Sequence, residues 1–258
     1  MKRGYSPGKR AGAPFGVQKR RDVKKAFVAG ATGYTGRSVV SELRAAGVQT
    51  WAHVRPDSSR LGEWRARFEA IGAVVDTTPW EERAFTARLA ELRPDLVFAL
   101  LGTTRARARA AAADASYEAI DYGLTALLLR ATRGSAPHAR FVYLSAIGVS
   151  GPSRNPYMDV RWRIEQEVLR SGIEYVITRP SFITGADRDE HRPGERAAAL
   201  VVNGALEMLG AIGLRGLRAR YRSMTGADLA HGLVAAALSN HARNTIADVR
   251  DLTRYAGL

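Results

Sequence analysis

The chain has 258 residues, of which 46% are apolar; this is enough for a sizeable core and excludes a fully disordered protein. It contains no cysteine, so disulfide scaffolds, thiol nucleophiles and cysteine-ligated metal sites are excluded. The formal net charge is +14, from 39 basic and 25 acidic side chains, a balance that first suggests a nucleic-acid partner.

The basic charge has two sources. Residues 1–25 contain nine basic side chains and one acid, a net charge of +8, which leaves +6 dispersed over the rest of the chain. Residues 1–24 are rich in glycine and proline and have no apolar period, which predicts a flexible tail. This tail is either a basic arm for acidic partners or nucleic acid, or a solvated extension. It lacks the apolar run of a signal peptide, so we expect a cytoplasmic protein.

From Lys25 onward, apolar runs of strand length alternate with helical patterns. Strands are expected at residues 25–29, 50–54, 73–75, 95–101, 140–144 and 173–178, and a long helix at about 105–132. This alternation predicts an α/β fold with a single Rossmann-type, doubly wound parallel sheet over residues 25–258. Ligands bind such sheets at the carboxyl ends of the strands.

A covering region is expected at about residues 180–226. Residues 197–214 within it are mostly apolar but include Asn203 and Glu207. They are barely long enough to cross a bilayer, so we interpret them as a helix over the pocket and expect no membrane anchor.

Glycine residues follow the first expected strand at a spacing typical of dinucleotide binding. Glycines permit a tight turn and a close approach of the backbone to a pyrophosphate, and the next helix supplies amide donors at its N-terminus. The cofactor-binding loop is predicted to comprise Gly30, Ala31, Thr32, Gly33, Tyr34, Thr35, Gly36 and Arg37.

The residues after the second strand indicate which dinucleotide is bound. NAD sites usually have an acid there, which accepts the ribose 2′-OH. Here Arg55 follows the strand and Arg37 ends the glycine loop, and two guanidinium groups suit a 2′-phosphate. Asp57 competes with them but lies beyond Pro56, and we expect it to point away. NADP(H) is therefore predicted in preference to NAD(H).

The glycine loop, Leu101-Gly-Thr-Thr-Arg105, and Arg179-Pro180 followed by Asp187-Arg-Asp-Glu-His-Arg-Pro-Gly-Glu195 occur in this order. Together they resemble the atypical short-chain dehydrogenase/reductase superfamily, and within it the NAD(P)H-binding, NmrA-like group that includes the oxidoreductase-like Tat-interacting proteins. The resemblance covers about residues 25–240. It implies that Asp76 lies near the adenine and that Gly102 and Thr103 lie at the nicotinamide-side ribose.

The superfamily is similar in using a Tyr-x-x-x-Lys pair and a serine at the end of the fifth strand. A phenol is a sensible acid–base group for the proton that accompanies hydride transfer, and a cation four residues away lies on the same helix face. Here the candidates are Tyr157 and Ser145, but position 161 is arginine. Arg161 supplies charge yet stays protonated, so it cannot relay a proton as lysine does, and no lysine follows Lys25.

Several residues have more than one interpretation. Ser145 either holds a substrate carbonyl, binds the nicotinamide or caps a turn. Asp121 is near the cofactor by resemblance, or it packs a helix. Asp228 is expected to be the N-cap of a late helix, and Asp187–Glu195 could close over the substrate. The five histidines show no metal-ligand spacing, so no metal site is expected.

Two functions fit these observations. The first is an NADP(H)-dependent reductase of a small carbonyl or quinone-like substrate, with Tyr157 as the proton donor and Arg161 supporting it. The second is a non-catalytic NADP(H) sensor that controls a protein partner. The altered Tyr-x-x-x-Lys pattern favours the sensor, whereas Tyr157 and the apolar cover favour the reductase.

Overall fold

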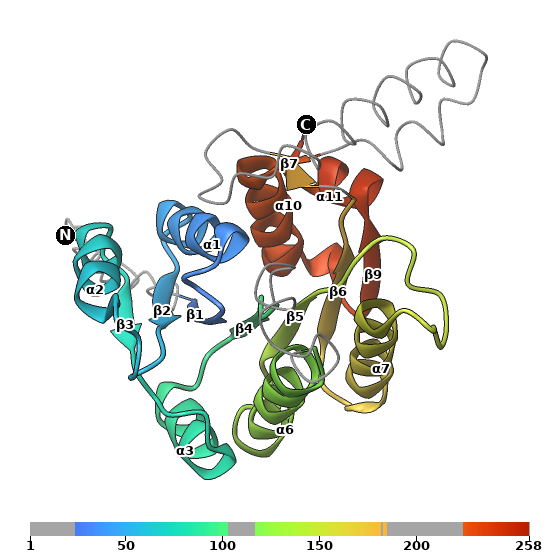
Figure 1. Cartoon of the computed structure of the whole chain (residues 1–258). Coiled ribbons are helices and arrows are strands. Elements are labelled where there is room, and N and C mark those ends of the chain that lie inside the picture. The colour runs from blue at the N-terminus through green and yellow to red at the C-terminus, as the bar shows by residue number, and fades with distance from the viewer. Residues whose placement is uncertain (1–23, 103–116, 182, 185–223, 258) are drawn as a thin grey trace, which may run out of the picture.

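Seven strands form one parallel sheet in a computed structural model that describes residues 24–102, 117–181, 183–184 and 224–257 (Figure 1). Their order is β3-β2-β1-β4-β5-β6-β9, and every neighbouring pair is parallel. The chain therefore runs outward in both directions from β1 and β4, which confirms the predicted doubly wound sheet. The strands are β1 (Lys25–Ala29), β2 (Gln49–His53), β3 (Val74–Asp76), β4 (Leu96–Ala99), β5 (Arg140–Leu144), β6 (Tyr175–Arg179) and β9 (Thr245–Asp248).

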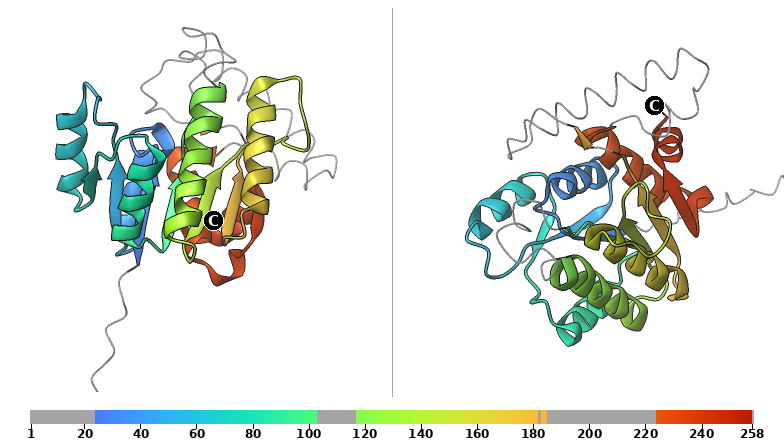
Figure 2. Two further views of the ribbon diagram at one scale, coloured as in Figure 1. Left: turned by 90° about the horizontal axis from the view of Figure 1, so that it is seen from below. Right: turned by 45° about the vertical axis from the view of Figure 1, so that its right-hand side comes forward.

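Helices cover both faces of the sheet (Figure 2). One face packs against α1, α2, α10 and α11, and the other against α3, α6 and α7. A π-helix, η1, leads directly into α6. The helices are α1 (Tyr34–Ala45), α2 (Leu61–Ala70), α3 (Glu82–Leu92), η1 (Tyr117–Leu124), α6 (Thr125–Ser135), α7 (Pro156–Arg170), α10 (Gly226–Leu238), the 3₁₀ turn η2 (Asn240–Ala242) and α11 (Val249–Ala256).

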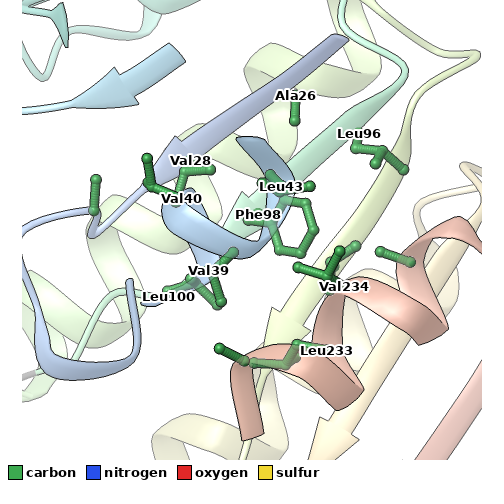
Figure 3. Packing of buried hydrophobic residues seen from close by; sticks show 14 of the residues in the cluster. Ala26, Val28, Val39, Val40, Leu43, Leu96, Phe98, Leu100, Leu233 and Val234 are labelled. Atoms are coloured by element: carbon green, nitrogen blue, oxygen red, sulfur yellow. The ribbon is translucent and has the colours of Figure 1, made fainter. Parts of the chain in front are cut away.

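The central strands are apolar on both faces because helices cover both. Val28 and Phe98 point toward α1 and α10, whereas their neighbours Phe27 and Val97 point toward the α3, α6 and α7 layer. Figure 3 shows Phe98 among side chains from α1 and α10, including Leu233. Because the strands are buried on both faces, their carboxyl ends are held at fixed positions. The candidate site lies at these carboxyl ends.

A two-stranded parallel sheet lies outside the main one. It pairs β7 (Ile183–Thr184) with β8 (Met224–Thr225), and α10 follows β8 directly. The two ends of the expected covering region are therefore side by side. Residues 185–223, with Asp187–Glu195 and the expected helix at 197–214, lie outside the described residues, as do residues 1–23 and Thr103.

Some expected boundaries were wrong. The fourth strand ends at Ala99 and not at residue 101, and the described part of the long helix begins as the π-helix η1. β9 was not predicted, because it has four residues and its Ile246 is 37% exposed, so it lacks a buried apolar run. The N-cap of α10 is Thr225, and Asp228 occupies the third helical position of a capping box.

No helix in the described ranges is long and apolar enough to cross a membrane.

Candidate active site

The connection from β1 into α1 requires glycine at two positions, Gly30 in the loop and Gly36 in the first turn of α1. Gly30 has φ of +81°, and a Cβ there would lie 2.5 Å from the carbonyl oxygen of Leu100. A Cβ on Gly36 would lie 2.1 Å from the carbonyl oxygen of Gly30. The loop is thereby pressed against both the end of β4 and the first turn of α1, as a pyrophosphate site requires.

The N-terminus of α1 has the character of an anion site. Gly33 is its N-cap and provides no side-chain hydrogen bond, and the first turn contains no acid. A helix start without these groups has amide donors and a partial positive charge available to a bound phosphate. The loop therefore fits the pyrophosphate of a dinucleotide.

The two predicted 2′-phosphate arginines have different surroundings. The guanidinium of Arg37 lies 5.5 Å from the ring centre of Tyr34, and that ring packs so closely on α10 that a Cβ on Gly226 would lie 2.4 Å from it. Arg55 is exposed and lies 3.6 Å from Asp57. Asp57 therefore does not point away, because its carboxylate is beside the arginine that was expected to bind phosphate.

Asp76, the predicted adenine neighbour, is the last residue of β3 and is only 3% exposed. Its carboxylate accepts hydrogen bonds from the Thr78 amide at 3.0 Å and from Arg88 Nε at 2.6 Å. Burial would raise the pKa of Asp76, but these hydrogen bonds outweigh it and hold the pKa below its usual value. An adenine contact by this carboxylate stays a prediction.

The start of α7 agrees with the sequence. Asn155 caps the helix by accepting hydrogen bonds from the amides of Tyr157 and Met158, and Pro156 occupies the first helical position. The next turns place Tyr157 and Arg161 on one face of the helix. The phenol and the cation are thereby brought to the carboxyl ends of the central strands.

Arg161 is buried and makes several contacts at this edge of the sheet. Its Nη1 donates to the carbonyl oxygen of Leu144 at 2.6 Å and to the Tyr143 hydroxyl at 3.4 Å, and its Nη2 lies 3.5 Å from Asp121 Oδ1. Its guanidinium carbon lies 4.5 Å from the ring centre of Tyr157. Burial opposes the charge, but Tyr157, Tyr143 and Asp121 outweigh it, so the pKa of Arg161 is above its ordinary value.

Tyr143 and Tyr157 both contact the guanidinium of Arg161, but they differ in burial. Tyr143 is 1% exposed, and burial raises its pKa so far that it stays a neutral phenol. Tyr157 is only half-buried and packs edge-on against Tyr117, with ring centres 5.7 Å apart. Of these two phenols, Tyr157 is the one that solvent or a ligand can reach.

Gly102 connects the glycine loop with this group. It is exposed just beyond β4, and a Cβ there would lie 3.4 Å from Arg161 Nη2 and 3.7 Å from Asp121 Oδ1. Gly30 contacts the same segment two residues earlier, at Leu100. A dinucleotide that extends from the loop along the end of β4 would therefore reach the Tyr157–Arg161 group.

Ser145 lies next to a carboxylate that the sequence did not reveal. Its Oγ donates to Glu165 Oε1 at 2.5 Å, and Arg179 donates to the same carboxylate from Nε at 3.0 Å and from Nη2 at 2.5 Å. Glu165 follows Arg161 by one helical turn, and this spacing is the one signal that could have identified it. Within the described ranges, no group of three or more histidine, aspartate or glutamate residues could hold a metal ion.

Residues 26–247 match the family described as the NAD dependent epimerase/dehydratase family. The chain belongs to this family. Binding of a nicotinamide dinucleotide is the property that the family description states, in agreement with the glycine loop. The wider resemblance to short-chain dehydrogenases is thus supported, while the narrower NmrA-like grouping stays a prediction.

Relatives with curated names support a different cellular location from the one expected. The chain is 31% identical to the mitochondrial protein fmp52-1 of Aspergillus terreus, over 67% of this chain and 72% of that one. It is 24% identical to the mitochondrial FMP52 of Candida albicans, over 69% and 75%. Because these family relatives are named as mitochondrial, the expectation of a cytoplasmic protein is wrong.

Solved structures share the family fold at low identity. The UDP-Glc/GlcNAc 4-epimerase of Campylobacter jejuni superposes with a TM-score of 0.60 at 13% identity, over 91% of this chain and 84% of that one. The Bordetella bronchiseptica enzyme WbmH, solved with NAD⁺, gives 0.57 at 15% identity, over 83% and 72%. These similarities confirm the fold class.

Proposed function

We propose that the protein is an NADP(H)-dependent reductase of the atypical, NmrA-like type, acting on a small carbonyl or quinone-like substrate. The observation that carries this proposal is the continuity of the site. The glycine loop packs against Leu100, just beyond β4, and a Cβ on Gly102, two residues later, would lie 3.4 Å from Arg161 Nη2. A phosphate site and a phenol–cation pair thereby belong to one edge of one sheet.

The chain's own residues divide the binding of the dinucleotide. The amides that begin α1 hold the pyrophosphate, and Arg37 and Arg55 hold the 2′-phosphate by charge-assisted hydrogen bonds. Gly102 lies along the nicotinamide-side ribose, and Asp76 lies near the adenine. The nicotinamide supplies the hydride when it is bound.

Tyr157 gives a proton to the substrate oxygen as the hydride reaches carbon. Arg161, 4.5 Å from the ring centre, stabilises the negative charge that remains on the phenol. Because Arg161 keeps its own protons, Tyr157 must regain a proton from water, and its half-buried position permits this. The reaction is therefore expected to be slow compared with a site in which lysine relays the proton.

A non-catalytic sensor of NADP(H) that regulates a protein partner is the second candidate. Two observations favour it. The cation at position 161 cannot relay a proton, and the hydroxyl hydrogen of Ser145 is donated to Glu165. Both features are compatible with binding and both weaken catalysis.

Turnover distinguishes the two candidates. The purified protein is incubated with NADPH and a panel of aldehydes, ketones and quinones, and NADPH oxidation is followed at 340 nm. A reductase shows oxidation that falls at least about a hundredfold in Tyr157→Phe. Tyr255→Phe, on α11 and remote from the site, is the matched control and keeps the wild-type rate. Tight NADPH binding without turnover, or a Tyr157→Phe variant as fast as wild type, contradicts the reductase.

A further inference from the structure

Glu165 joins α7 to the ends of two strands. It is 1% exposed, and its carboxylate accepts hydrogen bonds from Ser145, which follows β5, and from Arg179, which ends β6. The pair with Arg179 uses both carboxylate oxygens, a geometry in which both side chains are fixed. One side chain of α7 is thus bound to both neighbouring strands at the edge of the sheet where the site lies.

A second contact fixes the preceding turn of the same helix. Arg161 donates to the carbonyl oxygen of Leu144 at 2.6 Å, and Leu144 directly precedes Ser145. Two consecutive residues at the end of β5 therefore hold two consecutive turns of α7. A slip by one turn would move Tyr157 by about 5.4 Å, so these contacts determine where the phenol lies.

The hydrogen bond between Ser145 and Glu165 also fixes the direction of the hydroxyl. A carboxylate can only accept, so Ser145 is the donor in this pair, and a serine has one hydrogen to donate. Ser145 is itself only 3% exposed. Its hydrogen is therefore not available to a substrate carbonyl while the pair is intact.

We propose that Glu165 is the positioning residue of the site. It holds α7 on the ends of β5 and β6, so that Tyr157 and Arg161 lie where the substrate and the dinucleotide meet. Ser145 acts through Glu165 and not on the substrate. This inference rests on the proposed function for the identity of the reacting groups, but the geometry of α7 can be tested without any turnover.

Three variants distinguish the role of Glu165 from that of Ser145. Glu165→Gln keeps the size of the side chain and removes its charge, and Ser145→Ala removes the hydroxyl alone. Glu174→Gln is the matched control, because Glu174 also pairs with a buried arginine, Arg140, but at the amino end of the sheet. If Glu165→Gln does not fold, Glu165→Asp keeps the charge and shortens the link by one methylene.

The first readout is the NMR resonance of the Arg161 Nε–H group, identified by its loss in Arg161→Lys. This nitrogen is buried, and no hydrogen-bond acceptor for it is found among the residues described. Because Arg161 lies on α7 and is held at the end of β5, the resonance should shift when α7 moves relative to that strand. We expect Glu165→Gln or Glu165→Asp to move the resonance well beyond any change in Glu174→Gln. An unmoved resonance would overturn the positioning role.

The second readout is the rate of NADPH oxidation with menadione as the quinone probe. We expect kcat to fall at least about tenfold in Glu165→Gln and less than about tenfold in Ser145→Ala, because small displacements of reacting groups are costly. A larger loss in Ser145→Ala than in Glu165→Gln would show that Ser145 acts on the substrate. If wild type oxidises no NADPH, the proposed function fails, and the Arg161 resonance alone decides the role of Glu165.

Discussion

The guanidinium carbon of Arg161 lies 4.5 Å from the centre of the Tyr157 ring, one turn away on the same face of α7. The same guanidinium donates to the carbonyl oxygen of Leu144 at 2.6 Å. A guanidinium in this position can stabilise charge on the phenol but cannot give it a proton. Arginine at position 161 is therefore compatible with binding of the dinucleotide, but it removes the proton relay that lysine would provide for catalysis.

Arg161→Lys is expected to increase turnover. Lysine can exchange its protons with water and pass them on, so the rate of NADPH oxidation should rise about tenfold. The variant should also lose about 1–3 kcal/mol of unfolding free energy, because one ammonium nitrogen cannot occupy the positions of both Nη1, which donates to Leu144 and Tyr143, and Nη2, which faces Asp121. Arg170→Lys, at an exposed position in the last turn of the same helix, is the control and should change neither quantity. Unchanged turnover in Arg161→Lys would exclude the lost relay as the limit on rate.

Gly36→Ala is expected to abolish dinucleotide binding. The added Cβ would lie 2.1 Å from the carbonyl oxygen of Gly30, so the loop must move away from its position at the end of β4. NADPH affinity, measured by titration calorimetry, should fall at least about a hundredfold, with a loss of about 1–3 kcal/mol in stability. Gly62→Ala in α2 meets no atom within 4 Å and should bind NADPH as wild type does. Wild-type affinity for NADPH in Gly36→Ala would contradict the assignment of the glycine loop as the pyrophosphate site.

Arg140→Met is expected to destabilise the fold without affecting the site. Arg140 is buried at the start of β5, where it pairs with Glu174, and its Nη1 donates to the carbonyl oxygens of Ala237 at 2.5 Å and Ser239 at 2.7 Å at the end of α10. Urea denaturation should show a loss of about 3 kcal/mol. Arg243→Met removes the exposed arginine that shares Glu174 and should cost less than about 0.5 kcal/mol. Equal losses in the two variants would contradict this role.

His53 makes stability depend on pH. Burial lowers the pKa of His53 and outweighs two effects that raise it, the hydrogen bond from Nε2–H to the carbonyl oxygen of Thr78 at 2.8 Å and the charge of Asp76. The folded protein therefore favours the neutral ring. The unfolded chain therefore binds more protons below about pH 6.5, and folding becomes less favourable as pH falls through this range toward the folded pKa. Unfolding free energies at about pH 5 and 7 should differ less in His53→Gln than in wild type. Equal differences would contradict this assignment, and His138→Gln, on an exposed loop, is the control.

The sequence predicted the features that depend on local patterns. The succession of strands and helices along the chain follows from apolar periodicity, the glycine loop from glycine spacing, and the Asn155–Pro156 start of α7 from capping chemistry. A few neighbouring residues determine each of these patterns. β9 was missed because four residues with one buried side chain do not form a pattern. It is a strand because β6 pairs with it, which is a tertiary effect.

Long-range pairs in the site could not be predicted in the same way. Glu165 and Arg179 are far from Ser145 in sequence, and only the packing of α7 on β5 and β6 brings them together. Asp121 was a candidate with two interpretations, and its place beside Arg161 depends on the π-helix η1. Such helices often occur at functional sites, but no sequence pattern identifies them.

Dissociation constants for NADPH and NADH are the decisive measurement for this protein, made at low and at raised salt. Binding of NADPH at micromolar concentration, at least about tenfold tighter than NADH and weakened by salt, is expected if the glycine loop holds the pyrophosphate and Arg37 and Arg55 hold the 2′-phosphate. Equal affinities would contradict the NADP(H) preference. If neither nucleotide binds at micromolar concentration, the site is not a dinucleotide site.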